Sequence, residues 1–292
     1  WDRLLRKGIH LLRGQDRFDG SHLDGTVVIG GSILWEGAPL DFGQPKKPCF
    51  LIGPNCESAY SPEFRGRLET ALSCVTSCCF RDSASYMQFS KLSNVTWAPD
   101  VLFDYEPGLP KVTGQGIGIS VVSGKGAFRN DALREGYFAS IARLCMLCQE
   151  QKIPVRLLSF CAGEGDEEAI AKILDRVPRP EGIQASFYRG DPQALLAEMN
   201  ACQSIVATRF HAMILGWVLG KNVVPIIYST KQTQVLADCG FCGPMWNALE
   251  DQNMTGEELL EAVQAEQGRL DISDLKDRSK AQFSALDRFL QE

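Results

Sequence analysis

The chain has 292 residues, of which 45% are hydrophobic and 23% charged, a balance typical of globular proteins. This length is sufficient for two domains, each with its own hydrophobic core. The formal net charge of −6 argues against a general nucleic-acid-binding or anionic-membrane-binding surface. An acidic protein can still hold a local basic pocket.

The first half of the chain contains short apolar runs separated by helix-like segments. In chain order we expect a strand at 26–29, a strand at 49–53, a helix at 62–73, a strand at 75–80 and a helix at 83–90. The turn-rich segment Glu106-Pro107-Gly108-Leu109-Pro110 follows, and we place the domain boundary there.

From residue 117 onward, strands and helices alternate more plainly. We expect strands at 117–122, 155–160, 183–187, 204–208 and 223–228, and helices at 132–151, 166–174, 192–200, 210–219 and 231–238. This alternation predicts parallel sheets with helices on both faces. The sequence therefore predicts three units, which are an α/β domain at 1–106, a second α/β domain at 107–255, and a helical tail at 256–292 that can pack back on the first domain.

The stretch Arg209-Phe210-His211 joins an expected strand to an expected helix. Ligands bind outside the carboxyl ends of strands in open α/β sheets, and a helix N-terminus there favours an anion. Arg209 adds a planar fork for phosphate or carboxylate, and His211 adds a proton carrier that titrates near neutral pH. A capping arginine and a half-buried histidine are the alternative interpretation, which these residues alone leave open.

The block from Ser204 to Gly240 resembles the signature block of the polysaccharide pyruvyl transferase family. In that family an Arg-x-His at a strand end is followed by a helix, a strand with a proline-containing apolar run, and a lysine. Here these elements are Arg209 to His211, then Val223 to Tyr228, then Lys231.

Three earlier patches agree with this resemblance. Thr26 to Leu34 is similar to the family's early strand and glycine turn, and Phe50 to Asn55 to its next strand. Cys79 to Ser85, followed by Trp97 to Asp100, is similar to its Arg-Asp-x-x-Ser and Ala-Pro-Asp elements. The resemblance covers roughly residues 24–240, and its motifs are specific through their order and spacing.

The resemblance implies two Rossmann-like domains that face a cleft, the glycosyltransferase B-type architecture, with the acceptor on the first domain and the donor on the second. It implies transfer of pyruvyl from phosphoenolpyruvate to a sugar of a cell-surface polysaccharide or its lipid-linked precursor, forming a ketal and releasing phosphate. Phosphoenolpyruvate would be a co-substrate, and no cofactor is expected. The family usually begins with a strand and an Asn-x-Gly-Asp-like turn, and because none precedes Thr26 we expect an upstream segment to be missing.

This chemistry needs clustered cations, a general acid/base and a water-poor cleft. We expect His211 to be the acid/base and Arg209 a catalytic cation, both replaceable without loss of folding. His10 and His22, the other histidines, lie in no motif. The residues expected to bind substrate are Arg81, Lys231, Ser85, Asn55, Gly30 and Gly31.

Each assignment has a structural alternative. Arg81 could pair with its neighbour Asp82 on the surface, Lys231 could be a solvated helix-start lysine, and Asn55 could be a turn residue. For Asp100, and for Glu164 and Asp166 at the start of an expected helix, capping is the favoured role. The Gly30-Gly31-Ser32 turn lacks the spacing of a dinucleotide fingerprint, so NAD binding is not supported.

The eleven cysteines are odd in number and scattered, often in apolar runs, which is typical of free thiols in a reducing cytosol. We therefore expect a cytoplasmic protein with neither disulfides nor bound metal. Cys239 and Cys242 form a Cys-x-x-Cys pair, but it follows a helix instead of joining a strand to one, which argues against a redox role. No apolar run is long enough to span a bilayer, so any contact with a lipid-linked acceptor would be peripheral.

Two competing functions remain open. A nucleotide-sugar glycosyltransferase of the same architecture would release a nucleoside diphosphate in place of phosphate. A catalytically silent member of the fold would bind a sugar or a partner without turnover. The sequence leaves open the acceptor sugar, the ketal stereochemistry and the oligomeric state.

Overall fold

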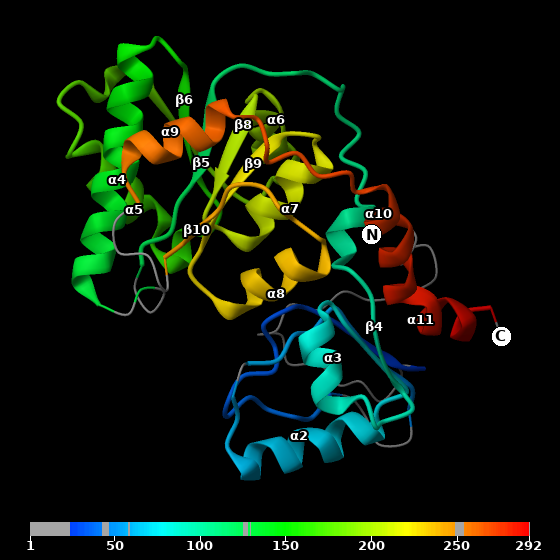
Figure 1. Cartoon of the computed structure of the whole chain (residues 1–292). Coiled ribbons are helices and arrows are strands. Elements are labelled where there is room, and N and C mark those ends of the chain that lie inside the picture. Colours follow the sequence, from blue (N-terminus) through cyan, green and yellow to red (C-terminus); the bar gives the residue numbers. More distant parts are fainter. Residues whose placement is uncertain are drawn as a thin grey trace.

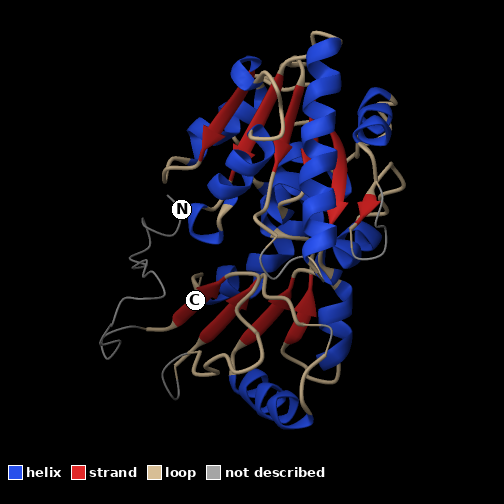
Figure 2. Cartoon of the chain, turned by 90° about the vertical axis from the view of Figure 1, so that its left-hand side faces the viewer, coloured by secondary structure: helices blue, strands red, loops and turns tan. Residues whose placement is uncertain are grey.

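The computed structural model describes residues 24–42, 47–57, 59–124, 128, 130–248 and 254–291. Within these ranges two all-parallel β-sheets lie one above the other, each covered by helices (Figures 1 and 2). The α/β class and the two-sheet architecture expected from the sequence are confirmed. His10 and His22 lie outside the described residues, as does the opening segment Asp2 to Leu12, for which the sequence suggests a helix.

The first sheet has four strands in sequential order. They are β1 (Thr26–Ile29), β2 (Cys49–Ile52), β3 (Ser77–Phe80) and β4 (Val95–Trp97). Two helices, α2 (Pro62–Cys74) and α3 (Ser83–Phe89), belong to this layer. Helix α2 begins where the Ser61 side chain accepts a hydrogen bond from the backbone N–H of Phe64, and Pro62 suits the first helical turn.

The second sheet has six strands in the order β10-β9-β8-β5-β6-β7. The strands are β5 (Ile117–Ser120), β6 (Val155–Ser159), β7 (Ile183–Phe187), β8 (Ser204–Ala207), β9 (Asn222–Ile227) and β10 (Trp246–Asn247). The helices between them are α4 (Asp131–Glu150), α5 (Asp166–Leu174), α6 (Pro192–Asn200), α7 (Phe210–Val218) and α8 (Thr230–Asp238). The two-residue strand β10 is not anticipated by the sequence, because it is too short to show any periodicity.

Helix α7 and strand β8 form the apolar centre of the second layer. All four residues of β8 are buried, and α7 turns Met213 and Trp217 into the same hydrophobic cluster. A Cβ atom on Gly216 would come within 2.7 Å of a Val223 methyl carbon on β9. A side chain at this position would therefore force the helix or Val223 to shift.

The tail after residue 255 divides between the two layers. Helix α9 (Gly256–Gln264) packs against α4 of the second layer, and α10 (Ser273–Ser279) packs against the short 3-10 helix η2 (Val101–Asp104). Helix α11 (Ser284–Phe289) reaches the first sheet, where the rings of Phe289 and Phe50 lie 5.5 Å apart. The expected return to the first sheet is thus made by the last helix (Figure 1).

Gln282 connects this tail to three strand ends of the first sheet. Its side-chain oxygen accepts a hydrogen bond from the backbone N–H of Gly53 at 3.0 Å. Its amide nitrogen donates to the carbonyl oxygens of Phe80 and Ala98, at 3.0 and 2.7 Å. One buried side chain therefore satisfies backbone groups at the end of β3 and just after β2 and β4, at the edge of the sheet that faces the second layer.

No helix in the described ranges is both long and apolar enough to cross a membrane.

Candidate functional site

The carboxyl ends of the two sheets face each other (Figure 2). Asp238, at the end of α8, accepts hydrogen bonds from the backbone N–H and hydroxyl of Ser83, at 2.7 and 2.5 Å, and so caps α3 of the other layer. Because parallel strands place their following loops at one edge, the expected site residues of both layers meet at this junction.

Arg81, directly after β3, is held by two residues of its own layer. Its Nη1 lies 3.2 Å from Oδ2 of Asp100, and its Nη2 donates to Oδ1 of Asn55 at 2.6 Å. The side chain is only 6% exposed, and its Nε has no hydrogen-bond partner among the residues that the structure describes. The alternative of a surface pair with Asp82 is wrong, because the Asp82 carboxylate instead accepts the backbone N–H and hydroxyl of Ser85.

The guanidinium group of Arg81 is sandwiched between the two layers. Its central carbon lies 4.2 Å from the centre of the Phe210 ring, a cation–π contact with the first residue of α7. On the other side it lies against Gly31, where an added Cβ would come within 2.3 Å of the same carbon. Gly31 is therefore required for the position of this cation, whereas a Cβ on Gly30 would meet only a side-chain methyl of Ile33, at 3.0 Å.

Lys231, the second residue of α8, reaches across to the first layer. Its Nζ donates to the hydroxyl of Ser32 at 3.0 Å, next to the glycine turn. Burial lowers its pKa, and the nearby Arg81 lowers it further. Lys231 is thus half-buried in the junction and differs from the solvated helix-start lysine of the alternative interpretation.

His211 stands in the first turn of α7 and keeps an exposed surface. Surrounding protein atoms nevertheless desolvate it, and this burial lowers its pKa from the ordinary value of 6.5. Asp100 raises this pKa, whereas Arg81 and Arg209 lower it. Charged groups of both layers therefore affect the pKa of this one imidazole.

Arg209 directly precedes α7 without making a side-chain capping hydrogen bond, and its guanidinium has other partners than that of Arg81. Its guanidinium forms a two-pronged ion pair with Asp166 and a further ion pair with Glu164. Asp166 is fully buried and also accepts the backbone N–H groups of Phe160 and Cys161, each at 2.9 Å. Burial lowers the pKa of Arg209, but the carboxylate hydrogen bonds outweigh it and raise this pKa overall.

This arrangement corrects the expectation that Arg209 can be removed without affecting folding. Its side chain is only 11% exposed and neutralises a carboxylate that has no access to solvent. Removing the guanidinium would leave Asp166 as an uncompensated buried charge, which typically costs about 3–5 kcal/mol. Glu164 and Asp166, for which the sequence favours capping, are in fact the direct partners of the expected catalytic arginine.

Two further predicted residues, Asn55 and Ser85, have different positions relative to the site. Asn55 is buried and accepts a hydrogen bond from Arg81, so it affects the site by positioning that side chain. Ser85 is also buried, and its hydroxyl is engaged with Asp82 and with the backbone N–H of Cys56. The structure therefore brings Arg81, Lys231, His211 and Gly31 together, whereas Ser85 supports the wall behind them.

A cavity of about 560 Å³ lies at the carboxyl edge of the second sheet. Its lining includes the Arg209–Glu164 pair, the glycine-rich turn around Gly163 and Gly165, and the side chain of Tyr228 after β9. The volume falls within the range of about 300–1,000 Å³ that is usual for small-molecule sites. Tyr228 carries no motif, and only its place after a buried strand could have marked it in the sequence.

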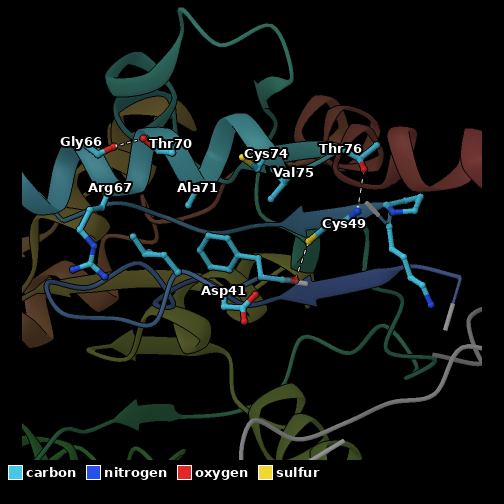
Figure 3. Close-up of a pocket in the computed structure, with 13 residues that line it drawn as sticks. Asp41, Cys49, Gly66, Arg67, Thr70, Ala71, Cys74, Val75 and Thr76 are labelled. Atoms are coloured by element: carbon cyan, nitrogen blue, oxygen red, sulfur yellow. Dashed lines mark hydrogen bonds between the residues drawn. The ribbon is translucent and has the colours of Figure 1, made fainter. Parts of the chain in front are cut away.

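A larger cavity, of about 990 Å³, lies at the other end of the first sheet. Figure 3 shows it between α2, which contributes Thr70 and Cys74, and the chain around Asp41 and Cys49. Cys49 is the first residue of β2, so this cavity is next to the amino ends of the strands. Since open α/β sheets bind ligands at the carboxyl ends, size alone does not make it the candidate site.

Metal and disulfide chemistry find no geometric support in the described residues. No three side chains of the metal-binding types lie close enough together to hold an ion there. All eleven cysteines fall within the described ranges as free thiols, and burial raises the pKa of several, to about 12 for Cys145 and Cys148.

Besides Ser83 and Asp238, Phe210 and Ser32 are residues of the junction that the sequence did not single out. Phe210 is the middle residue of the Arg-Phe-His stretch, and its ring joins the two layers through Arg81. The signal available in the sequence was its aromatic character at a strand-to-helix turn, which apolar packing explains equally well.

Solved structures with this architecture include nucleotide-sugar enzymes. The UDP-GlcNAc 2-epimerase from Neisseria meningitidis bound to UDP-GlcNAc is 11% identical, with a TM-score of 0.59, and the match covers 92% of this chain and 76% of that one. The Methanocaldococcus jannaschii UDP-GlcNAc 2-epimerase in complex with UDP-GlcNAc and UDP is 10% identical, with a TM-score of 0.58 and coverage of 99% and 78%. A UDP-forming trehalose-phosphate synthase from Burkholderia xenovorans is 14% identical, with a TM-score of 0.52 and coverage of 85% and 69%.

At these identities the similarity shows the fold alone, which is the glycosyltransferase B-type architecture. A search among curated proteins finds no match. The family model of polysaccharide pyruvyl transferase matches residues 2–230, a span that contains Arg81, Arg209 and His211 and ends one residue before Lys231. The chain is therefore a member of the polysaccharide pyruvyl transferase family, a family of transferases that act on polysaccharides.

Proposed function

We propose that the protein transfers the pyruvyl group of phosphoenolpyruvate to two hydroxyls of one sugar, forming a ketal and releasing phosphate. The observation that carries this proposal is the meeting of cationic side chains at the junction of the two layers, where Arg81 packs on the Phe210 ring and Lys231 donates a hydrogen bond to Ser32. Arg81 comes from the first layer, and Arg209 and Lys231 come from the second. Both arginines lower the pKa of His211. Family membership points the same way.

The donor carries a phosphate and a carboxylate, and the junction between the layers is suited to them. A guanidinium has five N–H donors, and the contacts with Asp100 and Asn55 use only part of the Arg81 set. Lys231 adds a second cation, and its ammonium group donates a hydrogen bond to the neutral hydroxyl of Ser32. The N-terminus of α7 adds a positive dipole end at the same edge.

The reaction balances without any oxidant or metal. The methylene carbon of phosphoenolpyruvate gains a proton and becomes a methyl group, while the central carbon forms two C–O bonds to the sugar and loses its bond to the phosphate oxygen. The two sugar hydroxyls lose one proton each. One of these protons replaces the one delivered to the methylene carbon, and the other leaves on phosphate.

His211 is the group that we propose moves these protons. Its lowered pKa makes the neutral imidazole the prevailing form near pH 7 in the free protein. A bound anionic donor would favour the imidazolium, because a nearby negative charge raises the pKa of a cationic acid. Donor binding would therefore charge His211 for protonation of the methylene carbon, after which the neutral ring could accept a proton from a hydroxyl.

Phosphate release from phosphoenolpyruvate tests this function, with acceptors containing galactose, mannose or N-acetylmannosamine. We expect release that depends on an acceptor and on His211, with His211→Ala as the background control. Release of a nucleoside diphosphate from a nucleotide sugar would establish the glycosyltransferase alternative instead. Sugar binding without either release would favour the catalytically silent alternative.

We further propose that the acceptor belongs to a cell-surface polysaccharide or its lipid-linked precursor, with peripheral contact to the lipid. A cytoplasmic location is part of the same proposal, supported by the free cysteines. Cell fractionation with an antibody against the native protein would check both, by showing whether it is recovered with the cytosol or with salt-extractable membrane material.

A further inference from the structure

Gln282 lies in the tail between α10 and α11, and its side chain is buried. Its Oε1 accepts a hydrogen bond from the backbone N–H of Gly53 at 3.0 Å. Its Nε2 donates to the carbonyl oxygens of Phe80 and Ala98, at 3.0 and 2.7 Å, and lies 3.3 Å from that of Pro99. One amide group of the tail therefore binds three strand ends of the first sheet.

The same three strand ends carry Asn55, Arg81 and Asp100, which we call the Arg81 cluster. Each member of the cluster follows a contact of Gln282 by one or two positions along the chain. Consecutive Cα atoms are about 3.8 Å apart, so one or two positions leave a residue little freedom once its predecessor is fixed. Gln282 thus restrains the backbone of all three members at once.

The orientation of the Arg81 guanidinium depends on the other two members of the cluster. Among the residues that the structure describes, its hydrogen bonds go to Asn55, at 2.6 Å, and to Asp100, at 3.2 Å, and its Nε has no partner. The bond to Asp100 is at the long end of the usual range of about 2.7–3.2 Å, so a small displacement weakens it. Asn55 and Asp100 can therefore orient Arg81 only while their own strand ends are held in place.

A parallel arrangement occurs in the second layer. Gln232 of α8 is also buried, and its amide nitrogen donates to the carbonyl oxygen of Thr208, the residue before Arg209, at 2.8 Å. Its amide oxygen accepts the backbone N–H of Tyr228 at 3.0 Å. An amide suits both places because it combines an acceptor oxygen with two N–H donors, whereas a carboxylate could not donate to a carbonyl. A buried glutamine thus holds the strand end directly before each of the two arginines.

We propose that Gln282 is a positioning residue for the donor site, because it holds the strand ends that carry the Arg81 cluster. It acts through Arg81 instead of touching the substrate. The inference rests on the proposed function for the role of Arg81 in binding phosphoenolpyruvate. Gln282 lies beyond residue 230, where the family match ends, so the tail contributes to the geometry of a site whose other residues come from earlier in the chain.

The test compares Gln282→Met with Leu286→Ala. Methionine has nearly the length of glutamine but forms none of these hydrogen bonds. Leu286 is the matched control, because it belongs to the same tail and packs with Phe50 and Ile52 of the first sheet, but its apolar side chain binds no backbone group. If Gln282→Met does not fold, Gln282→Asn replaces it with the same expected changes, since its amide is one methylene too short to bind all three strand ends.

Two readouts are measured on each variant. The first is the donor KM and kcat with phosphoenolpyruvate and a competent acceptor. The second is the NMR signal of the Arg81 Nε–H group, assigned by its loss in Arg81→Lys. The Phe210 ring lies over this guanidinium and shifts the signal, so Phe210→Leu shows where the signal lies without the ring.

We expect Gln282→Met to raise the donor KM about tenfold, the typical loss of a charge-assisted hydrogen bond, with a smaller change in kcat. It should also move the Arg81 signal toward its position in Phe210→Leu. Leu286→Ala should change neither the KM nor the signal. An unchanged KM or an unmoved signal in the folded Gln282 variant overturns the proposal, and so do equal changes in Leu286→Ala. If the unmodified protein bound no phosphoenolpyruvate, the proposed function would fail by itself, and the Arg81 signal would still decide whether Gln282 positions Arg81.

Discussion

The guanidinium of Arg81 lies 4.2 Å from the centre of the Phe210 ring, and this contact joins the end of β3 to the start of α7. A desolvated cation–π contact is worth about 2 kcal/mol, which corresponds to a factor of about 30 in affinity. The ring therefore helps to position Arg81, the cation that we propose binds the donor.

Replacing Phe210 with leucine should weaken phosphoenolpyruvate binding by about 10- to 30-fold, with a smaller change in turnover. Phe210→Tyr, which keeps the aromatic face, should restore the affinity. A suitable control is Phe187→Leu, because that ring lies under Arg189 at 5.2 Å on another part of the chain. Equal donor KM values for Phe210→Leu and the unmodified protein would show that the contact does not position Arg81 for the donor.

The neighbouring glycines of the first turn should respond differently to alanine. A Cβ at Gly31 would collide with the guanidinium of Arg81, whereas a Cβ at Gly30 meets only the methyl end of Ile33. We expect Gly31→Ala to displace Arg81 and raise the donor KM about tenfold or more, as loss of a charge-assisted hydrogen bond does. Gly30→Ala is the matched control, with a KM near that of the unmodified protein. Similar KM values for the two variants would contradict the sandwich arrangement.

Arg209→Ala should lower stability as well as activity. The fully buried Asp166 would lose its partner, and we expect the free energy of unfolding in urea to fall by about 3–5 kcal/mol. Adding Asp166→Asn should recover part of this loss, because the amide removes the uncompensated charge. An Arg209→Ala variant with unchanged urea midpoint and slope would mean that solvent reaches Asp166 after all.

His211 should set the pH dependence of catalysis. Its pKa is lowered below 6.5 in the free protein, so kcat/KM for the donor should fall as pH rises through that lowered value. In the donor complex the nearby anion raises the pKa, and the corresponding fall in kcat should therefore lie at higher pH. His211→Ala should remove this limb and reduce turnover by about 10²–10⁴-fold. Near-normal turnover of this variant with a competent acceptor would exclude the acid/base role.

Much of the architecture could be predicted from local sequence. The strand at 183–187 and the helices at 166–174 and 192–200 lie where the apolar pattern placed them, since Gly, Pro and Asp mark their ends. The Arg-Phe-His stretch lies at a strand-to-helix turn for the same reason. Strand β10 could not be predicted, because its two residues depend on pairing with β9 and carry no pattern of their own.

The sequence by itself determined which residues stand at strand ends: Arg81, Arg209, His211 and Lys231 each follow an apolar run, and that order is local. Only the tertiary structure decided their partners. The carboxylates that bind the two arginines, Asp100 and Asp166, lie 19 and 43 positions away along the chain. Such pairs arise when sheet order and helix packing bring distant strand ends together. Local periodicity carries no information on that order, and so the partners of these side chains appear only in the folded chain.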